Sequence, residues 1–290
     1  MASAPSAIVT DQLHLAYGER AIVDDLSIDL PHGQVTAIVG PNGCGKSTVL
    51  RSLARLLKPA SGNILRNGSD IQRSGTKELA RRLAILPQSP ITPSGITVRE
   101  LVGYGRFPHQ GLLRSASKED REAIDWALQI TNLGDMHDRE VDTLSGGERQ
   151  RAWIAMSLAQ KTDVLLLDEP TTYLDIHYQI EVLSLVRELN QEHGITVGWV
   201  LHDLNQAAAY SDQMIMLRQG KVVCHGQPAD VMTPASIRDV FGIECCVIQH
   251  PMGDAPVCLP NGFCGIANPD TCRVRQAASP TTSQMPMSAD

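Results

Sequence analysis

The sequence predicts an α/β fold with a mainly parallel core sheet, an N-terminal antiparallel β layer and an inserted α-helical subdomain. Three observations support this prediction. Apolar and polar residues alternate within the first thirty residues, whereas four later apolar runs are nearly uninterrupted, as in strands buried on both faces of a parallel sheet. A helical stretch at about residues 89–160 separates the first of these runs from the other three.

The alternating segment indicates strands with one face in solvent. Its apolar residues are Val23, Leu26, Ile28 and Leu30, and the polar residues between them are Asp24, Asp25, Ser27 and Asp29. This pattern is typical of an antiparallel sheet that covers a core on one side only. We therefore expect a small β layer around the ligand-binding region.

The four apolar runs cover residues 35–39, 164–167, 196–201 and 214–217. Three of them are followed directly by candidate ligand-binding residues. These are a glycine-rich segment from Gly40, the acidic pair Asp168 and Glu169, and His202. Open α/β sheets bind ligands beyond the carboxyl ends of their strands. We therefore expect these three groups to share one site.

The remaining elements follow from changes in pattern. Thr97–Glu100 and Ser117–Asp120 are shaped like helix N-terminal caps within the helical stretch. After about residue 243 the periodicity fades, and the last 22 residues have too little apolar content to become ordered. The predicted division is a domain at 1–243 with the helical subdomain at about 89–160, a short C-terminal extension at 244–268 and a disordered tail at 269–290.

The composition bounds the possible functions. A chain of 290 residues with 42% hydrophobic content can bury the core of one large or two smaller domains. A net charge of −7 argues against a nucleic-acid partner, which needs a basic face. No apolar run approaches the roughly 20 residues that span a bilayer, and the start at Met1 lacks the basic and apolar regions of a signal peptide. We expect a cytosolic protein that reaches a membrane only through a partner.

The glycine-rich segment matches the phosphate-binding pattern G-x-x-x-x-G-K-[ST]. A coincidental glycine-rich turn is the alternative, but the segment lies after a predicted strand and before an amphipathic helix. Its backbone N–H groups would surround a triphosphate, and the helix N-terminus adds the positive end of its dipole. Lys46 is expected to reach the β- and γ-phosphates, and the Ser47 hydroxyl to ligate Mg²⁺. The predicted nucleotide-binding residues are Gly40, Pro41, Asn42, Gly43, Cys44, Gly45, Lys46, Ser47 and Thr48.

The acidic pair and the histidine supply the chemistry of phosphoryl transfer. Asp168 is assigned to the Mg²⁺ shell, and Glu169 is assigned to a water in line with the γ-phosphate. A solvated pair at a strand end is the alternative for these two carboxylates. His202 would be a hydrogen-bonding switch near the γ-phosphate, or alternatively a buried histidine at a strand end.

Ser145, Gly146 and Gly147 open another helix, with Glu148 completing a capping box. A purely structural explanation therefore exists. The two adjacent glycines also expose the backbone of a helix N-terminus, which is an anion-binding arrangement.

Seven cysteines are present, including Cys44, Cys224 and a C-terminal group of Cys245, Cys246, Cys258, Cys264 and Cys272. Their spacing contains no C-x-x-C pair, so reduced thiols are expected rather than a metal site. Cys44 begins a helix, where a thiolate is stabilised. We therefore expect thiol alkylation to block hydrolysis of the triphosphate and the bound nucleotide to protect the protein.

Together these motifs resemble those of the nucleotide-binding subunits of ABC transporters, over residues 7–243. The resemblance implies a P-loop NTPase fold, ATP as substrate and Mg²⁺ as cofactor. It implies that Tyr17 stacks on adenine, that Gln88 senses Mg²⁺ and the membrane partner, and that residues 144–150 form the signature. By the same resemblance Asp175 lies across a dimer interface, and His202 is the switch histidine. The residues assigned to hydrolysis are then Lys46, Gln88, Glu169 and His202, and those assigned to the metal are Ser47, Gln88 and Asp168.

The resemblance also implies partners. Such subunits form head-to-tail dimers in which the signature of one copy closes over the phosphate loop of the other. They bind permease subunits at the cytoplasmic face of the membrane, and a solute-binding protein acts indirectly. Two other classes fit this chain less well. Regulatory modules without turnover would lack Glu169 or His202. Soluble ABC proteins of DNA repair or translation carry coiled-coil insertions or tandem cassettes.

The segment Leu101–His109 resembles a tract in the ATPases of iron-chelate importers, whose near relatives take up haem or vitamin B12. Residues 118–120, 123–128 and 247–252 fit the same subfamily. The alternative is a simple turn between two helices, with Pro108 ending one of them. The transported cargo is inferred here by analogy only.

Overall fold

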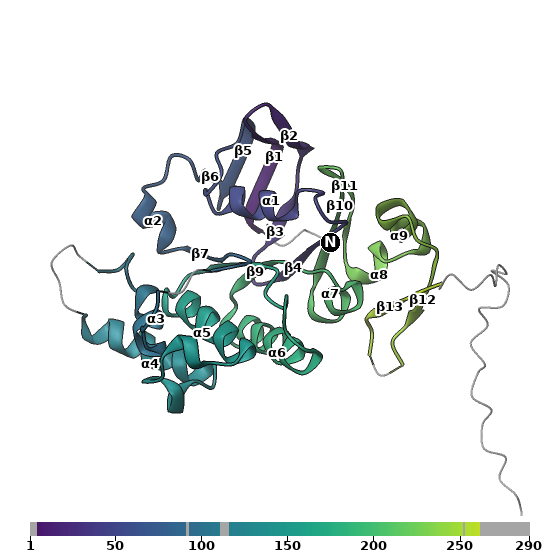
Figure 1. The fold of residues 1–290 in the computed structure, drawn as a ribbon. Coiled ribbons are helices and arrows are strands. Elements are labelled where there is room, and N and C mark those ends of the chain that lie inside the picture. The colour runs from purple at the N-terminus through teal and green to yellow at the C-terminus, as the bar shows by residue number, and fades with distance from the viewer. Residues whose placement is uncertain (1–4, 91–92, 111–115, 252, 262–290) are drawn as a thin grey trace, which may run out of the picture.

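The computed structural model describes residues 5–90, 93–110, 116–251 and 253–261 (Figure 1). Met1, Met252, Cys264, Cys272 and the predicted tail at 269–290 lie outside these ranges. Within them the chain forms three sheets, of five, six and two strands.

The five-stranded sheet is the predicted N-terminal β layer. It has the order β2-β1-β5-β6, with β3 pairing β1, and all of its pairs are antiparallel. Val23, Leu26, Ile28 and Leu30 are buried while Asp24 and Asp25 are exposed, which confirms the one-sided pattern. The strands are β1 (Ser6–Tyr17), β2 (Arg20–Leu26), β3 (Asp29–Pro31), β5 (Ser61–Arg66) and β6 (Ser69–Asp70).

The six-stranded sheet is the predicted parallel core, in the order β11-β10-β4-β9-β8-β7. Every neighbouring pair is parallel except the edge pair β10–β11. The four predicted apolar runs are β4, β8, β9 and β10, while β7 and β11 were not predicted. The strands are β4 (Val35–Val39), β7 (Leu83–Leu86), β8 (Val164–Asp168), β9 (Thr196–Val200), β10 (Gln213–Arg218) and β11 (Lys221–Gly226).

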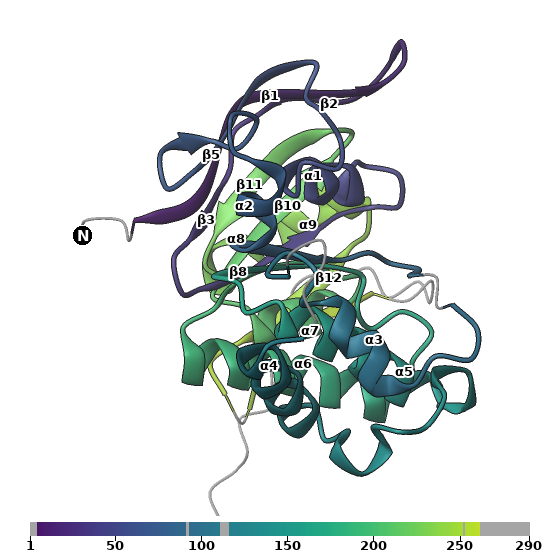
Figure 2. The ribbon, with the colours of Figure 1, turned by 90° about the vertical axis from the view of Figure 1, so that its left-hand side faces the viewer.

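The helices cover the core sheet, and Figure 2 shows α3, α4 and α5 on the side away from the β layer. These three helices pack on one another and form the predicted inserted subdomain. The capping boxes expected at Thr97 and Ser117 are both present. The α-helices are α1 (Lys46–Leu53), α2 (Thr76–Ala80), α3 (Val98–Tyr104), α4 (Lys118–Ile130), α5 (Gly146–Ala159), α6 (Ile176–His193), α7 (Leu204–Tyr210), α8 (Pro228–Val231) and α9 (Pro234–Phe241), and 3-10 turns lie at Gly134–Met136 and Val141–Thr143.

The core sheet separates two hydrophobic clusters. Along β8, Leu165 and Leu167 belong to the cluster on the helical side, and Leu166 belongs to the cluster shared with the β layer and α1. Because successive side chains of a strand point to opposite faces, one uninterrupted apolar run serves both clusters. The uninterrupted composition of these strands therefore follows from burial on both faces.

A hairpin of β12 (Cys245–Gln249) and β13 (Pro256–Pro260) follows the core and packs against α7 and α9. It lies within the segment predicted as a C-terminal extension. In the described part of the chain, the cysteines Cys44, Cys224, Cys245 and Cys258 are free thiols. No helix among the described residues is long and apolar enough to cross a membrane.

Candidate functional site

The phosphate loop joins β4 to α1, and its glycines adopt backbone conformations that other residues rarely reach. Gly40, Gly43 and Gly45 have φ values of 155°, 76° and 107°. A Cβ on Gly40 would lie 2.2 Å from the carbonyl oxygen of Leu217, so a side chain there would collide with backbone. Gly45 provides no side-chain cap for α1, which leaves the first N–H groups of that helix available to an anion.

Lys46 and Ser47 connect this loop to the acidic pair. The buried Lys46 donates from Nζ to the carbonyl oxygens of Gly40 (2.8 Å) and Pro41 (3.1 Å). Ser47 Oγ donates to Asp168 Oδ1 at 2.8 Å. Burial raises the pKa of Asp168, and the nearby Glu169 raises it further, against the lowering effect of the Ser47 hydrogen bond. A bound cation would oppose the effect of burial.

Three residues from different segments meet at the carboxylate of Glu169. His202 Nε2 lies 2.8 Å from Glu169 Oε1, while the Gln88 amide and the Thr172 hydroxyl both donate to Oε2. Gln88, Glu169 and His202 follow β7, β8 and β9, which are adjacent parallel strands. Their meeting confirms that the carboxyl edge of the sheet gathers these side chains.

A cavity of about 440 Å³ lies over this edge. Its lining combines residues of the predicted phosphate loop, the loop glutamine, Glu169 of the acidic pair and the histidine with two residues that the sequence did not indicate, Arg20 and Ile22. The lining residues are Arg20, Ile22, Asn42, Gly43, Gly45, Lys46, Ser47, Thr48, Gln88, Glu169 and His202.

Other predicted site residues do not line this cavity. Tyr17 lies at the end of β1 with 45% of its surface exposed. Ser145 caps α5 by accepting from the Glu148 N–H, and Asp175 caps α6 by accepting from the Tyr178 N–H. Gly147 also has a packing role, because a Cβ there would lie 2.5 Å from Cδ1 of Tyr178. Ser145 and Gly147 therefore have the structural roles that the capping-box explanation predicts.

The expectation of a stabilised thiolate at Cys44 was wrong. The side chain is buried, and burial raises the pKa of this thiol more than the Lys46 charge and the backbone N–H groups lower it. The position at a helix N-terminus does not compensate for the loss of solvent.

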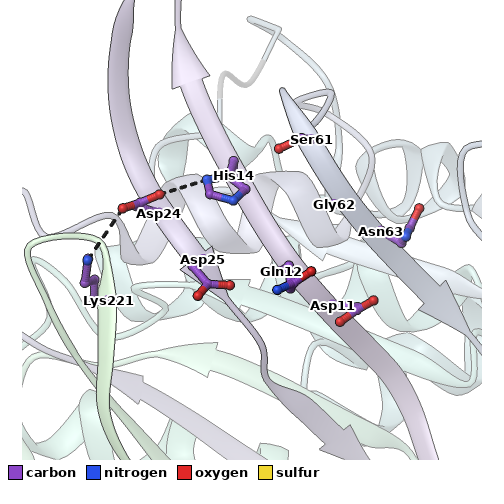
Figure 3. A pocket seen from close by; sticks show the side chains of 9 residues that line it. All are labelled: Asp11, Gln12, His14, Asp24, Asp25, Ser61, Gly62, Asn63 and Lys221. Atoms are coloured by element: carbon purple, nitrogen blue, oxygen red, sulfur yellow. Dashed lines mark ion pairs between the residues drawn. The ribbon is translucent and has the colours of Figure 1, made fainter.

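A second cavity, of about 660 Å³, lies on the outside of the β layer (Figure 3). Its Asp24 carboxylate is already engaged by His14 at 2.9 Å and by Lys221 at 3.5 Å. Among the described residues, no three His, Cys, Asp or Glu side chains are grouped so as to hold a metal ion. The phosphate-loop cavity, with the uncapped N–H groups of α1, Lys46 and the Glu169 carboxylate, is therefore the candidate site.

A phosphate loop between a parallel strand and a helix, with an acidic pair at the end of another strand of the same sheet, defines a P-loop nucleotide-binding protein. The family model for ABC transporters matches residues 23–172. A probable siderophore transport system ATP-binding protein of Bacillus subtilis, YusV, is 51% identical, and the alignment covers 89% of this chain and 94% of that protein. The ferric enterobactin transport ATP-binding protein of Escherichia coli, FepC, is 50% identical over 87% of this chain and 93% of its own length.

A solved inward-facing structure of an ABC transporter of the metal-chelate type has a TM-score of 0.77 and 28% identity, covering 88% of this chain and 98% of that one. The chain belongs to the ABC transporter family. Within that family it is an ATP-binding subunit that hydrolyses ATP.

Proposed function

We propose that this chain powers an importer of iron-siderophore chelates through partner permease subunits. The cargo is supported by relatives named for siderophore or enterobactin transport, which are 51% and 50% identical. The hemin import ATP-binding protein of Rhodococcus jostii, HmuV, is 39% identical, so its cargo is the less favoured alternative. The subunit would sit at the cytoplasmic face of the membrane, held by the permease, with a solute-binding protein acting indirectly.

The observation that carries the proposal is the convergence of Gln88, Thr172 and His202 on Glu169. A carboxylate held from three sides beside the phosphate loop is positioned to orient a water for attack on the γ-phosphate. His202 would hold the carboxylate in place, and Gln88 would link it to the subdomain that meets the permease.

Mg²⁺ fits the residues at this site. The Ser47 hydroxyl and the Asp168 carboxylate are 2.8 Å apart, and both are oxygen ligands of the kind that this ion prefers. We propose that these two residues hold it, with Gln88 nearby. When bound, the ion would neutralise charge on the phosphates. Lys46 would exchange its contacts with Gly40 and Pro41 for phosphate oxygens.

A second copy of the chain would complete the site. Ser145, Gly146, Gly147 and Asp175 do not line the cavity of their own chain, yet Ser145 begins a helix whose N-terminus suits an anion. We propose that they face the triphosphate of a partner copy, and that Tyr17 stacks on the adenine of its own site. Closure of the dimer would move the α3–α5 subdomain against the permease.

The test replaces the carboxylate at the centre of this arrangement. Glu169→Gln should bind ATP, accumulate as a dimer in MgATP and lose at least about 100-fold in phosphate release. Glu122→Gln, on the exposed side of α4, is the matched control and should hydrolyse ATP normally. Permease-dependent uptake of a labelled ferric siderophore by membrane vesicles tests the cargo. Normal phosphate release by Glu169→Gln would show that the glutamate is misassigned.

A further inference from the structure

Arg20 lines the nucleotide cavity but belongs to none of the motifs that define the site. It begins β2 and lies directly opposite Tyr17 in the β1–β2 ladder, so both side chains project from the same face of the β layer. Glu169 and His202 reach the cavity from the core sheet. Arg20 therefore approaches a bound nucleotide from a different layer of the molecule.

The backbone near Arg20 is fixed against the phosphate loop. A Cβ on Gly45 would lie 3.4 Å from Cγ2 of Ile22, so the loop packs directly on β2. The turn between β10 and β11 closes the arrangement, because the Gly220 N–H donates to the Cys44 carbonyl oxygen at 3.0 Å. A Cβ on Gly220 would lie 2.1 Å from the carbonyl oxygen of Ile22. These close approaches give Arg20 a defined place relative to the loop.

The guanidinium of Arg20 is uncommitted. It makes no ion pair or hydrogen bond with any residue in the described ranges, whereas Lys46 Nζ already contacts two carbonyl oxygens. Among the described residues that line the cavity, Arg20 and Lys46 are the two that carry a positive charge at every ordinary pH. A chain with a net charge of −7 needs local positive charge to attract a polyanion. A guanidinium matches pairs of phosphate oxygens in geometry as well as in charge.

We propose that Arg20 is a nucleotide-binding residue whose guanidinium pairs with phosphate oxygens of bound ATP. The inference rests on the proposed nucleotide site and adds a residue to it. Because Arg20 belongs to the β layer and makes no contact with Glu169, it stabilises the bound nucleotide equally before and during hydrolysis. Such uniform binding lowers KM and leaves kcat unchanged.

The test compares Arg20→Gln and Arg20→Lys in the full chain with Arg73→Gln as a control. Arg73 is an exposed arginine outside the cavity, 3.6 Å from Asp70. Calorimetric titration with ATP, ADP and adenosine, together with steady-state hydrolysis, gives the readouts. Arg20→Gln should weaken ATP binding and raise KM by about fivefold, as expected for an exposed charge pair. Its kcat and adenosine affinity should match the wild type, and Arg20→Lys should lie between the two.

Two results would overturn the inference. Unchanged ATP affinity in an Arg20→Gln variant that melts like the wild type would show that the guanidinium does not reach the nucleotide. An equal loss of affinity for ATP and adenosine would place the contact on the base rather than on the phosphates. Titration of the wild type with ATP distinguishes failure of this inference from failure of the proposed function. A wild type that does not bind ATP would contradict both. A wild type that binds ATP normally, beside an unaffected Arg20→Gln variant, would contradict only the role of Arg20.

Discussion

Two features of the surroundings of Cys44 have opposite effects on the pKa of its thiol. Its place at a helix N-terminus favours the thiolate, while its burial beneath the loop favours the thiol, and burial is the larger effect. The pKa of Cys44 is therefore above its ordinary value. At neutral pH this group is therefore mainly the unreactive thiol.

We predict that a maleimide reagent at pH 7 modifies Cys44 slowly and leaves ATP hydrolysis near its starting rate. Labelling should accelerate as the pH rises towards the raised pKa, because only the thiolate reacts. Mass spectrometry of the peptide containing residue 44, with the urea-unfolded protein as the reference for full reactivity, measures the rate. Rapid labelling of the folded protein at pH 7 would contradict the assignment of a buried thiol.

The residues that the sequence could identify are those with a fixed spacing. Lys46 and Ser47 stand at set positions of a glycine-rich pattern, and Glu169 follows a strand whose apolar run is easily seen. Arg20 has no such signal, because a single arginine at the start of a strand is common on any surface. Its relation to the phosphate loop depends on how β2 packs against Gly45, which is a tertiary contact.

At the scale of elements, predictability followed the length and composition of the strands. β4, β8 and β9 are five-residue strands buried throughout, and their runs were visible in the sequence. β7 has four residues, too few to be distinguished from a helical fragment, and it exists because β8 supplies its backbone partners. The β12–β13 hairpin mixes cysteine and proline with apolar residues, so it shows no clear period.

Asp212 joins three elements at the end of the core sheet opposite the nucleotide. Its Oδ2 accepts a hydrogen bond from the Val35 N–H at 2.8 Å, and Arg187 of α6 binds both carboxylate oxygens at 2.7 and 2.8 Å. Burial alone would raise the pKa of Asp212, but the Arg187 and Val35 hydrogen bonds outweigh it and the pKa is lowered. The charged form of Asp212 therefore stabilises the fold.

Asp212→Asn should destabilise the protein by about 2 kcal/mol at pH 7, the cost of losing hydrogen bonds to a charged group. The stabilisation by Asp212 is fully present above the unfolded pKa of about 3.9 and is lost as the pH falls through the lower folded pKa. The difference between variant and wild type should therefore shrink below about pH 4. Urea unfolding at pH 7 and below pH 4 measures this difference in the free energy of unfolding, and the exposed Asp138→Asn is the control. A difference that is the same at the two pH values would exclude the charge of Asp212 as its cause.

At the scale of the whole molecule, the proposed site is divided between two separate surfaces of the chain. The cavity contains the phosphate loop, Glu169 and His202, while Ser145 and Gly146 open α5 outside it. The sequence motifs predict both halves, and in our proposal a second copy placed head to tail joins them. Gly146 is the better position for testing this, because a Cβ there would make only an ordinary contact, 3.7 Å from Cδ2 of Leu174.

Two inactive variants should therefore restore activity when they are mixed. Lys46→Ala removes the phosphate contact of its own loop, and Gly146→Asp places a negative charge where the partner's phosphates would lie. Each homodimer has two defective sites, but a mixed dimer has one site with an intact loop and an intact signature. If one complete site suffices for turnover, random pairing of equal amounts predicts about one quarter of the wild-type rate. Phosphate release after the two variants are refolded together measures the restored activity. A mixture no more active than its components would indicate that each chain hydrolyses ATP within its own cavity or that both sites must be intact.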